Sequence, residues 1–175
     1  MKNIKYLIQF IFAFTSLVIF KLLGPNISSF ISGKIFEKIG PFFRSNKIIL
    51  SNINRAFPNI ESKKINILTK SMWNNYGRVF AEYVFIKQFR FGHLSSKIKI
   101  EGKEILDEIK NKNKQVIFIS GHFSNFELMA MCIEKHGINL SAIYRPLNNF
   151  FLNVFMERIR KKYICRNQIK KGIGG

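Results

Sequence analysis

The feature that most constrains the fold is the stretch from Gln115 to Lys135. It opens with Val116-Ile117-Phe118-Ile119, an apolar run rich in β-branched side chains that stops at Ser120-Gly121. Such a run predicts a buried strand. The apolar residues that follow have the spacing of one helix face: Phe126, Met129, Ala130 and Ile133. A buried strand followed by a helix is typical of a parallel α/β sheet.

The turn between this predicted strand and helix carries His122, and Glu127 lies in the first helical turn. Parallel α/β sheets place their functional groups in such turns. Because helical side chains lean toward the helix N-terminus, we expect Glu127 to point at His122, fix its tautomer and support it as a general base. The alternative is structural: Ser124 and Glu127 have the spacing of a capping box, which would start the helix near Ser124.

Motifs spread along the chain extend this pattern. The block from His122 to Glu127 reads HFSNFE, and five further segments accompany it: Asn54–Pro58 (NRAFP), Tyr76-Gly77-Arg78 with Glu82, Glu101-Gly102, Tyr144–Asn148 (YRPLN) and Ile169–Gly172. Together they resemble the lipid A biosynthesis (lauroyl/myristoyl) acyltransferases of the lysophospholipid acyltransferase superfamily, whose H-x4-E block takes the form HFGNWE. Ser124 stands where that family usually has Gly, and Phe126 where it usually has Trp.

The resemblance implies an acyl-ACP-dependent glycolipid O-acyltransferase, which moves a fatty acyl group from acyl carrier protein to a hydroxyl of a lipid A precursor. It assigns proton removal to His122, the orientation of His122 to Glu127, and substrate binding to Arg145 and Asn125, with Arg145 on a phosphate. It implies no metal or redox cofactor. It also implies the bacterial inner membrane as the location, with the catalytic part on the cytoplasmic side.

The net charge of +19, from 29 basic and 10 acidic residues, favours an acidic partner or surface, with a biased base composition of the genome as the alternative source of part of the excess. We expect an anionic membrane, an anionic glycolipid and an acidic carrier protein. We expect no nucleic acid, because the chain has no helix-turn-helix, zinc-finger or RNA-recognition signature. Arg158, Arg160, Lys161 and Lys162 cluster near the end of a predicted helix, where they complement its dipole. The alternative function is a non-catalytic, basic, membrane-associated binding module.

Residues 1–23 contain an apolar run, Tyr6–Phe20, with Lys2 and Lys5 before it and Lys21 after it. The run is shorter than the ~20 apolar residues of a typical membrane-spanning helix. We interpret residues 1–23 as an uncleaved membrane anchor, with a signal peptide and a buried helix as the alternatives. Residues 27–43 predict a helix with one basic and one apolar face, which suits either a membrane surface or a core.

The remaining periodicity predicts helices over 46–57, 61–89, 102–113 and 152–163, and strands over 97–100 and 139–144. The predicted fold is α/β, with a mostly parallel sheet flanked by helices and preceded by a membrane-associated helix. We assign residues 24–175 to the N-terminal part of an acyltransferase domain. Because the family continues beyond this point, we expect a partial domain with an exposed sheet edge and weak activity on its own.

Overall fold

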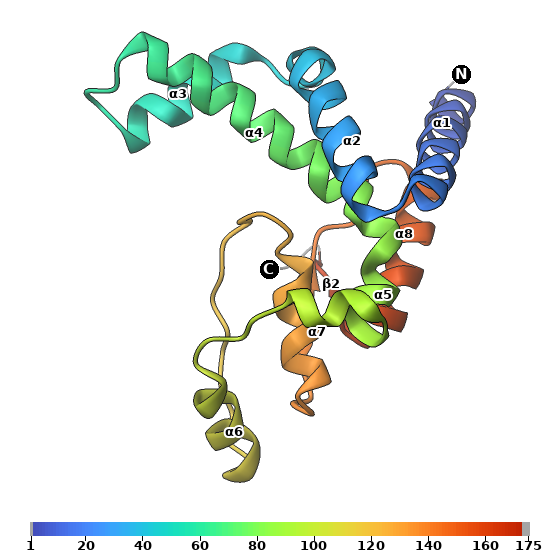
Figure 1. The fold of residues 1–175 in the computed structure, drawn as a ribbon, viewed down its shortest axis with the longest axis vertical. Helices are drawn as coiled ribbons and strands as arrows, with labels where there is room; N and C mark the ends of the chain where they lie inside the picture. Colours follow the sequence, from blue (N-terminus) through green and yellow to red (C-terminus); the bar gives the residue numbers. More distant parts are fainter. Residues whose placement is uncertain (1, 173–175) are drawn as a thin grey trace. The chain divides into compact units, whose positions relative to one another are not determined.

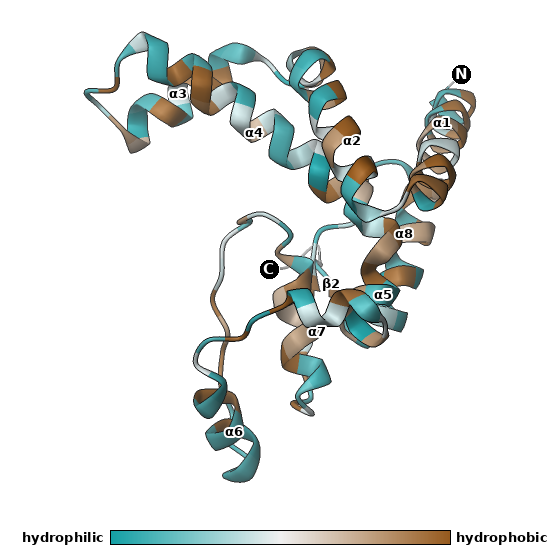
Figure 2. Cartoon of the chain, viewed as in Figure 1, coloured by the Kyte–Doolittle hydropathy of each residue, from teal (hydrophilic) through white to brown (hydrophobic). Residues whose placement is uncertain are grey.

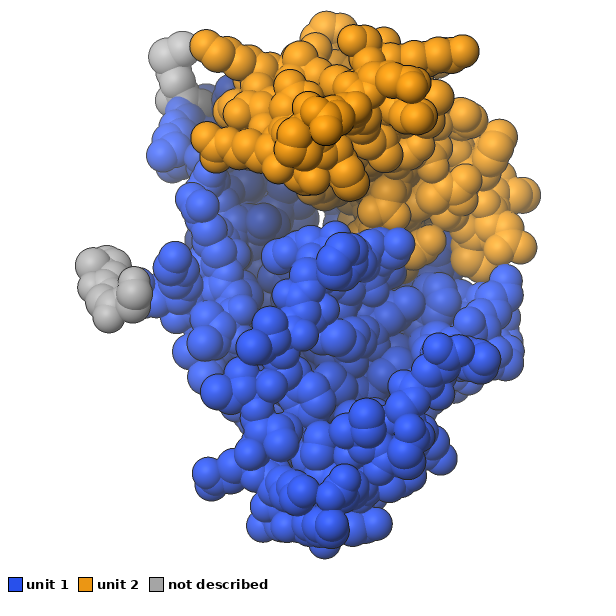
Figure 3. All heavy atoms as spheres, turned by 90° about the vertical axis from the view of Figure 1, so that its left-hand side faces the viewer, with its two compact units in different colours: residues 1–16, 85–175 blue, residues 17–84 orange. Residues whose placement is uncertain are grey.

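The computed structural model describes residues 2–172, which fold mostly into helices (Figure 1). The chain divides into two compact units, which Figure 3 shows in different colours. The first unit combines the residues up to Ser16 with those from Phe85 onward. The second unit is Leu17–Val84, so the boundary between the units falls within the first helix.

The predicted helices are confirmed, with small shifts at their ends. The helices are α1 (Lys2–Leu23), α2 (Pro25–Ile39), α3 (Asn46–Ala56), α4 (Ser62–Glu82), α5 (Ile86–Phe91), α6 (Lys103–Asn111), α7 (Glu127–Lys135) and α8 (Phe150–Tyr163). A 3₁₀ turn, Tyr83–Phe85, divides the predicted 61–89 helix into α4 and α5. Two further 3₁₀ turns, Gly40–Phe42 and His93–Lys97, follow α2 and α5.

The sheet among the described residues is smaller than predicted. It has two parallel strands, β1 (Ser141–Tyr144) and β2 (Asn167–Lys170), with Ser141 opposite Asn167 and Tyr144 opposite Lys170. The strand predicted over 139–144 is therefore confirmed, and α8 connects β1 to β2 in one β-α-β unit. The strand predicted over 97–100 is wrong, because Lys97 ends a 3₁₀ turn and residues 98–100 are irregular.

The strand predicted over 116–119 is also wrong. Residues 115–123 form neither helix nor strand, and Ile117 and Ile119 are 89% and 93% exposed. The physical reason is that a strand depends on its neighbours: β propensity reflects packing on a pleated surface rather than an intrinsic preference of the backbone. A sheet of two strands is itself marginal and provides little apolar surface for a third run to cover.

Arg90 of α5 joins three elements of the first unit. Its Nη1 lies 2.9 Å from Oε2 of Glu134 in α7, and also donates to the carbonyl of Tyr163 at the end of α8, at 3.2 Å. The other carboxylate oxygen of Glu134 accepts from the backbone N–H of Arg166, at 2.8 Å. Both charged side chains are nearly buried. The apolar core of this unit includes Phe85, Ile86, Leu94, Met131 and Ile164.

In the second unit, α2 and α4 approach each other closely through small residues. Ser32 Oγ donates to the carbonyl of Gly77 at 2.6 Å, and both Ser28 and Ser32 are fully buried. A Cβ on Gly77 would collide with the backbone carbonyl of Ser32. Gly77, which interrupts the apolar periodicity of the 61–89 segment, is therefore required by the distance between the two helices.

We expect Gly77→Ala to destabilise the second unit by about 1–3 kcal/mol, because the added methyl forces two packed backbones apart. The measurement is denaturant unfolding followed by the fluorescence of Trp73, which is buried in the same unit. Ser71→Ala, at an exposed position of the same helix, is the matched control. Equal unfolding midpoints for the two variants would show that the helices can separate without cost.

Candidate active site

A cavity of about 480 Å³ in the first unit brings together three of the four predicted site residues. Its walls come from the loop before α7, the first turns of α7, β1 with the residues after it, and α8. His122, Glu127 and Arg145 line the cavity, together with Arg160. Its apolar walls include Met129, Ile143, Leu147 and Ile164.

His122 lies on an exposed loop rather than at the end of a strand. Its ring packs edge-on against Phe126, with a centroid distance of 4.4 Å and an angle of 64° between the planes. This aromatic contact orients the imidazole.

The capping-box interpretation of the loop is wrong. The helix begins at Glu127 with Phe126 as its N-cap, and no side chain caps it. Ser124 adopts φ = 43°, in the left-handed region that a side chain disfavours and glycine tolerates. The acyltransferase family that the motifs resemble usually has glycine at this position, and glycine suits that conformation.

Glu127 is held by Arg160 of α8. Arg160 Nε and Nη2 both donate to Oε1 of Glu127, at 2.8 and 2.6 Å. The two side chains are only 15% (Arg160) and 8% (Glu127) exposed. The Arg160 guanidinium also lies 5.6 Å from the ring centroid of Tyr144 in β1. This buried ion pair therefore fixes the start of α7 against α8 and next to β1.

The described contacts include no hydrogen bond between Glu127 and His122, although both line the same cavity. We expected the Glu127 carboxylate to contact His122. It instead accepts hydrogen bonds from Arg160. Sequence reasoning missed this role of Arg160 because it grouped the side chain with a basic cluster that complements the helix dipole. The available signal was position: Arg160 lies one helical turn after Met156, a residue of the apolar face predicted for this helix.

Arg145 follows β1 at the rim of the cavity and is exposed. It makes no ion pair with any residue of the described part of the chain. Two lysines of the same unit are engaged with an acid: Lys161 and Lys170 lie 2.9 and 3.3 Å from the carboxylate of Glu157. Hydrogen bonding from Lys161 is the main cause that lowers the pKa of Glu157 to about 2. Arg145 is thus an exposed cation of the cavity lining to which an anionic ligand can bind. A guanidinium binds phosphate or carboxylate in a bidentate manner.

Asn125, the fourth predicted residue, does not line the cavity. It is half-buried, and its backbone carbonyl accepts from the N–H of Leu128 at 3.1 Å, at the start of α7. This backbone bond helps to shape the turn into the helix. The assignment of Asn125 to substrate binding stays a prediction.

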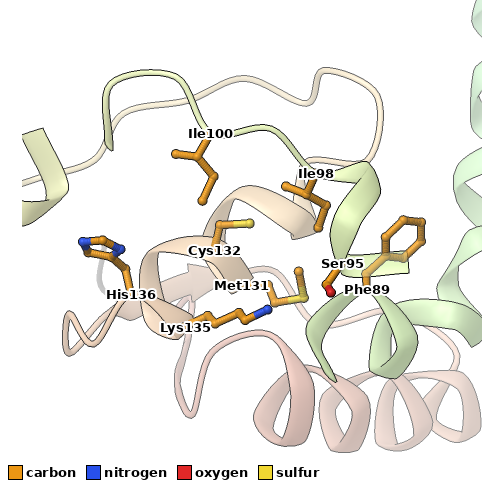
Figure 4. A pocket seen from close by; sticks show the side chains of 8 residues that line it. All are labelled: Phe89, Ser95, Ile98, Ile100, Met131, Cys132, Lys135 and His136. Atoms are coloured by element: carbon orange, nitrogen blue, oxygen red, sulfur yellow. The ribbon is translucent and has the colours of Figure 1, made fainter. Parts of the chain in front are cut away.

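A second cavity of about 310 Å³ lies on another side of α7 (Figure 4). Phe89, Ile98, Ile100 and Met131 form its apolar walls, and Cys132 is among its lining residues. Burial raises the pKa of the Cys132 thiol, so this cysteine stays protonated and unreactive at neutral pH. His136 at the edge is occupied by Asp107, whose Oδ1 lies 2.8 Å from Nε2. Neither Cys132 nor His136 is therefore a free nucleophile or base in this cavity.

Comparisons with known proteins agree with the motifs. Residues 1–169 match a family model described as bacterial lipid A biosynthesis acyltransferase. The lipid A biosynthesis acyltransferase 2 of Shigella flexneri is 29% identical over 63 residues, which make up 36% of this chain and 20% of that protein. The match thus spans a fifth of the relative's length. No solved structure matches the chain significantly.

We expect Arg160→Met to lower the free energy of unfolding by about 3–5 kcal/mol, because it leaves the Glu127 carboxylate buried without its partner. Denaturant unfolding measures this loss. Arg158→Met, at an exposed position of the same helix, is the matched control and should change stability little. Adding Glu127→Gln to Arg160→Met should recover part of the loss, because it removes the buried charge. A double variant as unstable as the sum of its single variants would show that the two groups do not interact.

Proposed function

We propose that this chain, which belongs to the bacterial lipid A biosynthesis acyltransferase family, transfers a fatty acyl group from an acyl carrier protein thioester to a hydroxyl of a lipid A precursor. The observation that carries the proposal is the cavity that gathers His122, Glu127 and Arg145 from separate parts of the sequence. Its polar side supplies a base, a carboxylate and cations, and its apolar side suits a hydrocarbon chain.

In the proposed reaction, His122 is the general base. Its neutral imidazole takes the proton of the acceptor hydroxyl as that oxygen attacks the thioester carbonyl carbon. The carbon–sulfur bond then breaks, and the imidazolium returns the proton to the departing thiolate. The products are an ester and a free thiol. Every step is a proton transfer or an acyl transfer, so the balance requires no oxidant, reductant or metal.

Glu127 is proposed to orient His122 and to stabilise the imidazolium. The Arg160 ion pair supports this role indirectly, because it holds one carboxylate oxygen in place at the cavity wall. Arg160 is then a positioning residue, which acts through Glu127. Arg145 is proposed to bind a phosphate of the acceptor, and its exposure at the rim without an ion-pair partner among the described residues supports that assignment.

We expect His122→Ala to lower the rate of acyl transfer by about 10²–10⁴-fold, the usual contribution of a general base. Stability should change little, because His122 lies on an exposed loop. The assay uses membrane-reconstituted protein with an acyl carrier protein thioester and a lipid A precursor. His93→Ala, an exposed histidine of the same unit outside the cavity, is the control. Parent-like turnover by His122→Ala would exclude His122 as the base, and no transfer by the parent would favour the binding-module alternative.

The N-terminal helix is proposed to anchor the chain in the bacterial inner membrane, with the cavity on the cytoplasmic side. Within the described residues, α1 is the helix that is long and apolar enough to cross a membrane, and an N-terminal signal sequence would meet the same criterion. Only Leu17 and Phe20 of α1 are buried, whereas many of its apolar side chains are exposed. Figure 2 colours much of this helix as hydrophobic. The helix therefore presents an apolar surface that a bilayer would cover, which argues against the buried-helix alternative.

We expect the chain to stay with membranes through a high-salt wash, because salt screens the lysine contacts but leaves apolar burial unchanged. Sedimentation after the wash, with the N-terminus sequenced from the pellet, measures this. An intact N-terminus in the pellet supports the uncleaved anchor. Release by salt alone would show an electrostatic attachment, and a chain that has lost α1 would show a signal sequence.

A further inference from the structure

A turn at the end of α2 exposes two adjacent aromatic side chains. Phe42 and Phe43 are 88% and 71% exposed; Phe42 ends the 3₁₀ turn Gly40–Phe42, and Phe43 follows it. Large aromatic side chains are normally among the most buried in a folded unit. Two adjacent ones on a surface turn indicate a surface that something covers.

The fold prevents these phenylalanines from turning inward. Gly40 lies directly against the indole of Trp73, where a Cβ would collide with the ring. The N–H of Phe43 donates to the carbonyl of Gly40 at 2.9 Å, which closes the turn. On the other side of the turn, Ile49 of α3 is buried. The turn is therefore anchored at both ends, and its tip is held outward.

The charge around the turn has a single sign. From Lys38 to Ile60 the sequence contains Lys38, Arg44, Lys47 and Arg55 and no acidic residue. All four basic side chains are exposed, and none forms an ion pair within the part of the chain that the structure describes. The nearest preceding acid, Glu37, is occupied by Lys34 and by Asn74, at 3.1 and 2.6 Å.

We propose that the turn from Pro41 to Arg44 inserts into the surface of an anionic membrane, as a second contact separate from α1. Aromatic side chains enter the boundary between headgroups and acyl chains, about 5–10 Å deep, while basic residues around them meet anionic headgroups. A protein partner fits less well, because a specific protein interface buries about 800 Å² on each side, far more than a two-residue tip supplies. The consequence is that the turn after α2 contacts the lipid directly, in addition to α1.

The test uses the full chain in vesicles that contain brominated lipid, which quenches tryptophan at the acyl boundary. Phe42→Trp places a reporter at the tip, and the signal of the parent, whose one tryptophan is Trp73, is subtracted. Asn111→Trp, at an exposed polar position at the end of α6, is the control. We expect the tip reporter to shift to shorter wavelength and to be quenched in vesicles with phosphatidylglycerol, and the control reporter to stay unshifted and unquenched.

The charge is tested on the same reporter by adding Arg44→Gln and Lys47→Gln, which should reduce the quenching although the chain still sediments with the vesicles. Absence of quenching at the tip, or equal quenching at tip and control, would overturn the proposal. A blue shift that appears without vesicles and grows with protein concentration would overturn it too, since it would show that a second copy of the chain covers the turn. Acyl transfer is not measured, so the result is independent of the proposed catalytic role.

Discussion

The ion pair between Glu127 and Arg160 is the interaction on which the candidate site depends. It joins the first residue of α7 to the last turns of α8, across the strand that α8 follows. With so little sheet to hold these elements, a charged pair that is almost buried defines where the helix can start. Such a pair adds little net stability compared with an apolar contact, but each partner is costly to bury without the other. The position of the cavity wall is thus fixed by the cost of burying either charge alone, and not by a large net stabilisation from the ion pair.

The second unit is organised by backbone proximity instead of charge. Gly77 and Ser32 let α2 and α4 approach until a side-chain hydroxyl reaches a helical carbonyl. Gly40 does the same for the turn that follows α2, which rests on Trp73. Glycine at both places costs more backbone entropy on folding than another residue would, but it allows the close contact. The result is a closely packed helix pair, and the turn that rests on Trp73 presents Phe42 and Phe43 to solvent.

Local patterns predicted the helices well and the sheet poorly. The apolar spacing along α4 and α8 contains the information that a helix needs, because helical hydrogen bonds close within four residues. The run Val116–Ile119 has the composition of a strand, but the neighbours that would pair with it lie elsewhere in the chain. The same distinction applies to the site. His122 and Arg145 were predicted from motifs, whereas Arg160 was assigned to a basic cluster at the end of a helix, since no local pattern indicates that a helical arginine contacts a glutamate 33 positions earlier.

The sequence by itself determined the family, the helical segments, the basic character and the apolar N-terminal run, because these are properties of composition and of short-range spacing. Only the tertiary structure decided which groups share a cavity and which apolar side chains stay exposed. It paired Glu127 with Arg160 instead of His122, left Ile117 uncovered and held Phe42 outward. Each of these outcomes is a competition between partners distant in sequence, and such competition is resolved by packing in three dimensions and not by any local preference.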